Sequence, residues 1–130
     1  MKSVYYYLDL AIQTAKRGDD DRRYLLGAVG IRADGVLVRS SNGAPARPTM
    51  DTHAEARISR KLDFGSIVFV ARVLKLDGSL AMARPCKACL RRLLSRRISK
   101  VYYTINSSEF GWIDFDRNTE NKKKGTAFAV

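Results

Sequence analysis

Apolar residues recur along the chain with spacings that distinguish helices from strands. Residues 3–16 place apolar side chains three and four positions apart, which predicts an amphipathic helix. Two apolar runs follow, at 25–32 and 36–41, and Asp34-Gly35 separates them. An Asp-Gly pair tolerates positive φ and is typical of a tight turn, so we expect a β-hairpin here.

The middle of the chain continues with alternating helical and extended patterns. Ala54, Ile58 and Leu62 have helical spacing. Residues 67–74 form an almost continuous β-branched apolar run, which predicts a strand buried on both faces. We expect a third helix to start at Pro85, because the first helical turn does not need the N–H group that proline lacks.

The order of these elements predicts one α/β domain that spans residues 1–130. Strands alternating with helices indicate three layers, α/β/α, around a single mixed sheet of five strands. The last two strands, at 100–105 and 112–115, are separated by too few residues for a parallel crossover, so we expect them to be antiparallel. The lysine-rich residues 119–130 are expected to form a frayed basic tail.

Composition excludes several classes of protein. The 130 residues are 45% hydrophobic and 28% charged, which argues against a disordered chain and against a membrane-spanning one. The first residues lack the apolar run of a signal peptide. The two cysteines lie three positions apart, too close for a stabilising disulfide. We therefore expect a cytoplasmic protein with reduced cysteines and no membrane partner.

Charge is the unusual property of this sequence. Lys and Arg number 24 against 13 Asp and Glu, which gives a formal net charge of +11. Such an excess favours a polyanion, a phosphorylated substrate or a membrane surface as partner. Residues 84–100 contain seven basic side chains and no acidic one, which fits either a solvated helix face or a strip that binds phosphates. Three of these side chains are candidates for phosphate or nucleic-acid contacts, namely Lys87, Arg91 and Arg92.

Two short motifs carry the residue types of a metal site. His53 and Glu55 form an H-x-E motif, while Cys86 and Cys89 follow Pro85 as C-x-x-C. One imidazole and two thiolates make three zinc ligands, and a catalytic zinc site keeps its fourth position open for water. A structural site would need a fourth protein ligand, and the chain has only these two cysteines and one histidine. Either motif alone is common, but H-x-E followed by P-C-x-x-C is the signature of zinc nucleobase deaminases.

On these motifs the chain resembles the cytidine deaminase superfamily, over about residues 5–115. The resemblance implies the three-layer fold of that superfamily and a zinc ion (Zn²⁺) held by His53, Cys86 and Cys89. It also implies that Glu55 carries protons while the amino group of a cytosine is replaced by oxygen from water. Many members are dimers or tetramers, so the resemblance implies a homo-oligomer.

The substrate is less well defined by the sequence. Asn42 has the place of the asparagine that binds the sugar in free cytidine deaminases. Those enzymes, however, use cysteine where this chain has His53, and they place a ribose-binding glutamate where it has Ala44. We expect four residues to contact the substrate: Asn42, Ala54, Tyr24 and Arg84.

The charge and the departures from free cytidine deaminases favour one substrate class over the others. Cytosine in a phosphate-bearing substrate, either single-stranded nucleic acid or a nucleotide such as dCMP, is the leading hypothesis. The alternatives are a free cytidine or deoxycytidine deaminase, a tRNA-type adenosine deaminase, and a non-catalytic nucleic-acid-binding module stabilised by zinc.

Overall fold

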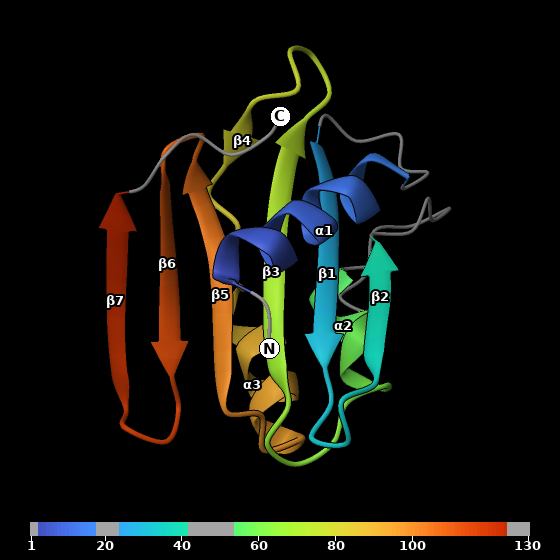
Figure 1. Ribbon diagram of the computed structural model, residues 1–130, viewed down its shortest axis with the longest axis vertical. Helices are drawn as coiled ribbons and strands as arrows, with labels where there is room; N and C mark the ends of the chain where they lie inside the picture. Colours follow the sequence, from blue (N-terminus) through green and yellow to red (C-terminus); the bar gives the residue numbers. More distant parts are fainter. Residues whose placement is uncertain (1–2, 18–23, 42–53, 125–130) are drawn as a thin grey trace.

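Ten helices and strands make up the part of the chain that the computed structural model describes, residues 3–17, 24–41 and 54–124 (Figure 1). Most of them lie within a few residues of the elements that the apolar pattern predicts. In chain order they are α1 (Val4–Lys16), β1 (Tyr24–Ile31), β2 (Leu37–Ser41), α2 (Ala54–Ser59), β3 (Ile67–Leu74), β4 (Leu80–Ala81), α3 (Lys87–Ser95), β5 (Lys100–Asn106), β6 (Glu109–Asp114) and β7 (Thr119–Lys124).

The strands form a single mixed sheet in the order β2-β1-β3-β5-β6-β7, and β4 pairs with β3 outside this path. The pair β3–β5 is parallel, and the other pairs are antiparallel. A parallel pair needs a crossover connection, and α3 lies in the segment between β3 and β5. The antiparallel arrangement of the two strands expected near residues 100–115 is confirmed.

The sheet has seven strands, so the expectation of five is wrong. The two additional strands are β4, which is only two residues long, and β7. Residues 119–124 were expected to belong to a frayed tail, but they pair with β6 along its whole length, from Asp114 back to Glu109. The tight turn before β7 places Asn118 at a φ of 53°, a conformation that asparagine tolerates better than most residues. Residues 125–130 lie outside the described residues.

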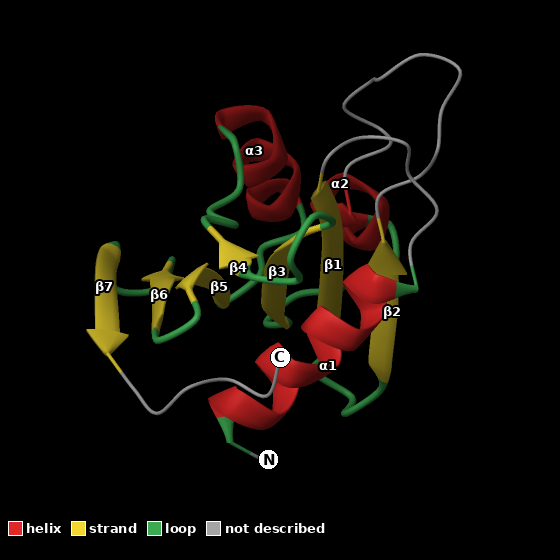
Figure 2. Ribbon diagram, turned by 90° about the horizontal axis from the view of Figure 1, so that it is seen from above, coloured by secondary structure: helices red, strands yellow, loops and turns green. Residues whose placement is uncertain are grey.

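The three-layer architecture is confirmed, since α1 covers one face of the sheet while α2 and α3 cover the other (Figure 2). On the α1 face, the rings of Tyr7, Phe69 and Tyr102 stack in sequence with centroids 5.0 Å apart. Gly27 of β1 lets α1 cross close to the sheet, because a Cβ atom there would lie 2.2 Å from the carbonyl oxygen of Ala11. None of the helices that the structure describes is long and apolar enough to cross a membrane.

The opposite face of the sheet carries the candidate chemistry. Ile58 of α2 and Leu93 of α3 are fully buried against Val68 and Val70 of β3. Side chains alternate between the two faces of a strand, so Arg72 points to the same face as these valines. A charged side chain is therefore placed on the face that α2 and α3 cover.

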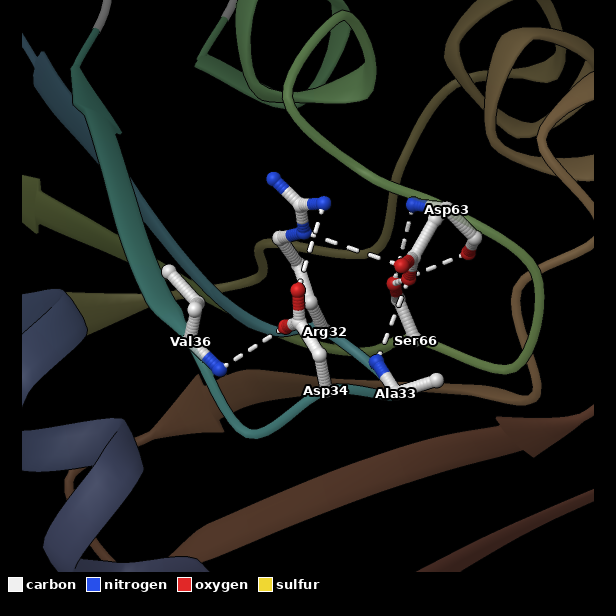
Figure 3. A network of polar contacts seen from close by, with 6 residues as sticks. All are labelled: Arg32, Ala33, Asp34, Val36, Asp63 and Ser66. Atoms are coloured by element: carbon white, nitrogen blue, oxygen red, sulfur yellow. Dashed lines mark hydrogen bonds and ion pairs between the residues drawn. The ribbon is translucent and has the colours of Figure 1, made fainter.

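A polar network fastens the loop after α2 to the turn of the β1–β2 hairpin (Figure 3). The carboxylate of Asp63 accepts hydrogen bonds from the Ser66 hydroxyl at 2.7 Å and from the Ala33 N–H at 3.1 Å. The Arg32 guanidinium lies 3.6 Å from Asp63 and 3.4 Å from Asp34. The Ser66 and Ala33 hydrogen bonds, with help from Arg32, lower the pKa of Asp63 below its usual range. This network therefore holds the loop between α2 and β3 against the turn of the β1–β2 hairpin.

Candidate active site

The two cysteines lie in the first turn of α3. Cys86 is the N-cap residue, and its Sγ accepts a hydrogen bond from the N–H of Cys89 at 3.5 Å. Pro85 precedes the cap, so the helix begins two residues later than expected. The positive end of a helix and its unpaired N–H groups favour thiolates, the form of cysteine that binds metals. Cys86 is exposed and Cys89 is buried, so the pair reaches from the surface into the core.

Glu55 lies in the first turn of α2 and is only 4% exposed. Within the described residues its Oε1 atom has no hydrogen-bond partner. Burial raises the pKa of this carboxyl group to about 7, although a backbone hydrogen bond and the charge of Arg72 act in the opposite direction. An unsatisfied buried polar atom is costly and needs an explanation, and a bound ligand or water is one.

A cavity of about 120 Å³ brings residues from both helix starts together. Glu55 from α2 and Cys86 from the start of α3 both line it, although 31 positions separate them in the sequence. Tyr24 and Arg84, two of the residues expected to contact substrate, line the same cavity. The remaining lining residues come from β1, β3 and the segment before α3, namely Leu26, Arg72, Met82 and Ala83.

The donor chemistry around this cavity fits a zinc ion. Two thiols at a helix N-terminus are soft ligands of the kind that zinc prefers, and Cys86 faces the cavity that the buried carboxylate of Glu55 also lines. The described residues contain no group of three metal-binding side chains, and the expected third ligand, His53, lies outside them. His53 directly precedes the first residue of α2 in the sequence.

The other residues singled out in the sequence have different positions. Ala54 is completely buried in the core and is not among the residues that line the cavity. Lys87 and Arg91 are exposed on α3, Arg92 is half-buried, and these three do not line the cavity either. Asn42 lies outside the described residues. Substrate contacts by Ala54, Asn42 and the three basic residues stay predictions.

Arg72 is a cavity residue that the sequence analysis did not identify. Its guanidinium carbon lies 3.9 Å from the centroid of the Tyr24 ring, which is a cation–π contact. One face of Tyr24 is therefore covered by Arg72. The available signal was an arginine within the apolar run at residues 67–74, since a charged residue in a buried strand needs a partner or a function.

Comparison with known proteins identifies the class to which this fold and site belong. Residues 1–105 match the model of a protein family described as the cytidine and deoxycytidylate deaminase zinc-binding region. The chain belongs to this family, and zinc is its metal.

A solved structure agrees with this assignment at the level of the fold. It is the crystal structure of a glutamate-to-glutamine mutant of cytidine deaminase from Mycobacterium tuberculosis, which superposes with a TM-score of 0.55 at 19% sequence identity. The match covers 80% of this chain and 86% of the mycobacterial chain. A comparison with curated proteins found no match. The family match ends before β6 and β7, which follow residue 105.

Proposed function

We propose that this protein is a zinc-dependent hydrolytic deaminase that converts cytosine to uracil in a phosphate-bearing substrate. The substrate is single-stranded nucleic acid or a nucleotide such as dCMP. The observation that carries this proposal is the buried carboxylate of Glu55, whose Oε1 atom lacks a protein partner within the described residues and which lines one cavity with Cys86. A purely structural zinc site has no use for such a carboxylate.

The roles of the residues in this proposal follow from the resemblance to zinc deaminases, and the positions of Glu55 and Cys86 on one cavity support them. His53, Cys86 and Cys89 hold the zinc, which when bound lowers the pKa of a water molecule toward neutrality. Glu55 accepts one proton from the attacking water and delivers it to ring atom N3, and it then accepts the second proton from the hydroxyl group on C4 and delivers it to the departing amino group. The products are uracil and ammonia, so one water molecule is consumed. General acid–base groups of this kind contribute about 10²- to 10⁴-fold to a rate.

The charge of the cavity supports a substrate that carries phosphate. Arg72 and Arg84 both line it, against the single carboxylate of Glu55. Arg84 is already paired with Glu120, and a neutral nucleoside brings no anionic group to Arg72. The net charge of +11 raises the local concentration of anionic ligands in the same way. Assembly as a homodimer or homotetramer and a cytoplasmic location remain predictions.

The decisive experiment replaces Glu55 by glutamine, which keeps the size of the side chain and removes its ability to carry protons. We expect Glu55→Gln to keep its zinc and its fold and to lose at least 100-fold in kcat. Glu109→Gln, in β6, is the matched control because Glu109 does not line this cavity. Mass spectrometry would follow the one-dalton gain on cytidine, deoxycytidine, dCMP, single-stranded DNA, RNA and tRNA.

The outcomes separate this proposal from its alternatives. Turnover of cytosine in dCMP or in an oligonucleotide supports it. Turnover confined to nucleosides, or an adenosine-to-inosine change in tRNA, assigns the substrate to another branch of the superfamily. Full activity of Glu55→Gln contradicts the mechanism. A zinc-loaded wild-type protein that acts on none of these substrates is a binding module.

A further inference from the structure

A second cavity of about 320 Å³ lies next to the proposed catalytic cavity. The two share Met82 and Arg84 as lining residues, so these side chains form the wall between them. The rest of the second cavity comes from β5 and β7, namely Tyr103, Ile105, Glu120, Asn121 and Lys122. Three of these residues belong to β7, which lies beyond the residues that the family model matches.

Arg84 is held in the shared wall by Glu120. Its Nε donates to Oε2 of Glu120 at 2.8 Å, and its Nη2 donates to Oε1 at 3.2 Å. A two-point pair of this kind fixes the plane of the guanidinium as well as its position. A guanidinium has five N–H donors, and this pair uses two of them. The other three N–H donors of Arg84 belong to a guanidinium whose orientation Glu120 already fixes, at the boundary between the two cavities.

Glu120 is itself fixed from the opposite side. The hydroxyl of Tyr103 donates to Oε2 of Glu120 at 2.5 Å, across the intervening strand β6. Gly111 of β6 makes this reach feasible, because a Cβ atom there would lie 2.5 Å from the Tyr103 ring. Both carboxylate oxygens of Glu120 are therefore engaged, and its charge is paired with that of Arg84.

Lys122 supplies the remaining charge of the second cavity. It is two residues from Glu120 on β7, so both side chains point to the same face of the strand. The lining residues carry two cations against one carboxylate, and the carboxylate is already paired with Arg84. An oriented guanidinium and an ammonium group around one cavity are suited to an anion with several oxygens.

We propose that the second cavity binds the phosphate group attached to the reacting cytosine nucleotide. Lys122 and Arg84 contact the phosphate, and Glu120 is a positioning residue that acts through Arg84. This inference rests on the proposed function, since it places the base in the cavity that Glu55 lines. The phosphate belongs either to a mononucleotide or to the backbone of a single strand, and both present the same tetrahedral anion.

The test compares two adjacent lysines on β7. Lys122→Ala removes a cavity residue, whereas Lys123→Ala removes the same charge from the opposite face of the strand. We expect Lys122→Ala to lower kcat/KM about tenfold for dCMP or for a short single-stranded DNA, mainly through KM, and to leave deoxycytidine unaffected. Lys123→Ala should leave kcat/KM unchanged both for the phosphate-bearing substrates and for deoxycytidine. An effect on dCMP alone identifies a mononucleotide as substrate, and an effect on the oligonucleotide identifies a strand.

A second variant tests the positioning role. Glu120→Gln keeps the size of the side chain and removes the charge that orients Arg84, so we expect KM for phosphate-bearing substrates to rise at least fivefold while kcat is retained. Equal effects on dCMP and deoxycytidine would overturn this role, because they would indicate general damage to the fold. If Lys122→Ala and Lys123→Ala lowered kcat/KM for the phosphate-bearing substrates by the same factor, the assignment of the phosphate to the second cavity would be overturned.

A binding measurement keeps this inference separate from the proposed function. Titration calorimetry with dCMP and with deoxycytidine needs no turnover. Suppose that the wild-type protein does not deaminate, and that Lys122→Ala weakens dCMP binding while Lys123→Ala does not. The phosphate site is then supported, and the proposed reaction is wrong. If deamination is observed and Lys122→Ala binds dCMP as tightly as the wild-type protein, then the proposed phosphate site is wrong and the proposed reaction is supported.

Discussion

The two cysteines illustrate how one residue type has two functions within a single helical turn. Cys86 is exposed and faces the cavity, so replacing it changes little in the core. Cys89 is completely buried among the apolar side chains of the domain. A buried thiol behaves as a small hydrophobic group as well as a potential ligand. We therefore expect loss of Cys89 to affect both metal binding and packing.

This difference leads to a prediction about zinc content and stability. We expect Cys86→Ser and Cys89→Ser each to reduce bound zinc to less than a tenth of an equivalent, because a hydroxyl is a poor replacement for a thiolate ligand. Only Cys89→Ser should also lower the stability of the metal-free protein. Plasma mass spectrometry measures the zinc, and urea unfolding in the presence of a chelator measures the stability. Ala88→Ser, between the two cysteines, is the control, and retention of full zinc by either cysteine variant would contradict the ligand assignment.

At the scale of elements, the sequence predicts best those parts that carry a clear apolar pattern of their own. The helix at Val4–Lys16 follows from its periodic apolar stripe, and the strand at Ile67–Leu74 follows from its almost continuous apolar run. The strand Thr119–Lys124 has no apolar pattern, since all six of its residues are exposed at the sheet edge. It is ordered by its pairing with β6 instead. The sequence does not identify Glu120 as a site residue, because its contact with Arg84 spans 36 positions.

The packing of α1 on the sheet gives a prediction at this scale. A side chain at Gly27 would collide with the backbone of Ala11 and Ala15, which cannot move without displacing the helix. We expect Gly27→Ala to destabilise the protein by about 3 kcal/mol, as overpacking in a core does. Gly30→Ala is the control, since its closest new contact is the mobile end of the Leu62 side chain, and we expect it to cost about 1 kcal/mol. Urea unfolding of both variants measures the difference, and equal midpoints would show that α1 adjusts.

At the scale of the molecule, the candidate active site and the main polar network occupy opposite ends of the central strands. Leu26 pairs with Arg72 near one end of β1 and β3, and Ile31 pairs with Ile67 at the other end. The network around Asp63 follows directly after that second end. Changes at one end of the strands can therefore alter stability without altering the chemistry at the other.

Acid sensitivity tests this separation. The pKa of Asp63 is lowered in the folded protein, so the folded state binds this proton less readily than the unfolded state. The stabilisation is present above the ordinary carboxyl pKa of 3.8 and is lost as the pH falls through the lowered value. We expect Asp63→Asn to be less stable than the wild-type protein at pH 7, with a smaller difference near pH 3, and to keep its kcat. Asp9→Asn on α1 is the charge-matched control, and a pH-independent difference in urea midpoints would contradict this account.

The lysines of β7 have a consequence for the behaviour of the protein in concentrated solution. β7 is an edge strand, and an edge strand offers unpaired N–H and C=O groups to any other chain that can extend the sheet. Lys122, Lys123 and Lys124 place three consecutive positive charges along this edge. Two such edges repel one another, so the strand that borders the proposed phosphate cavity also opposes aggregation of the sheet.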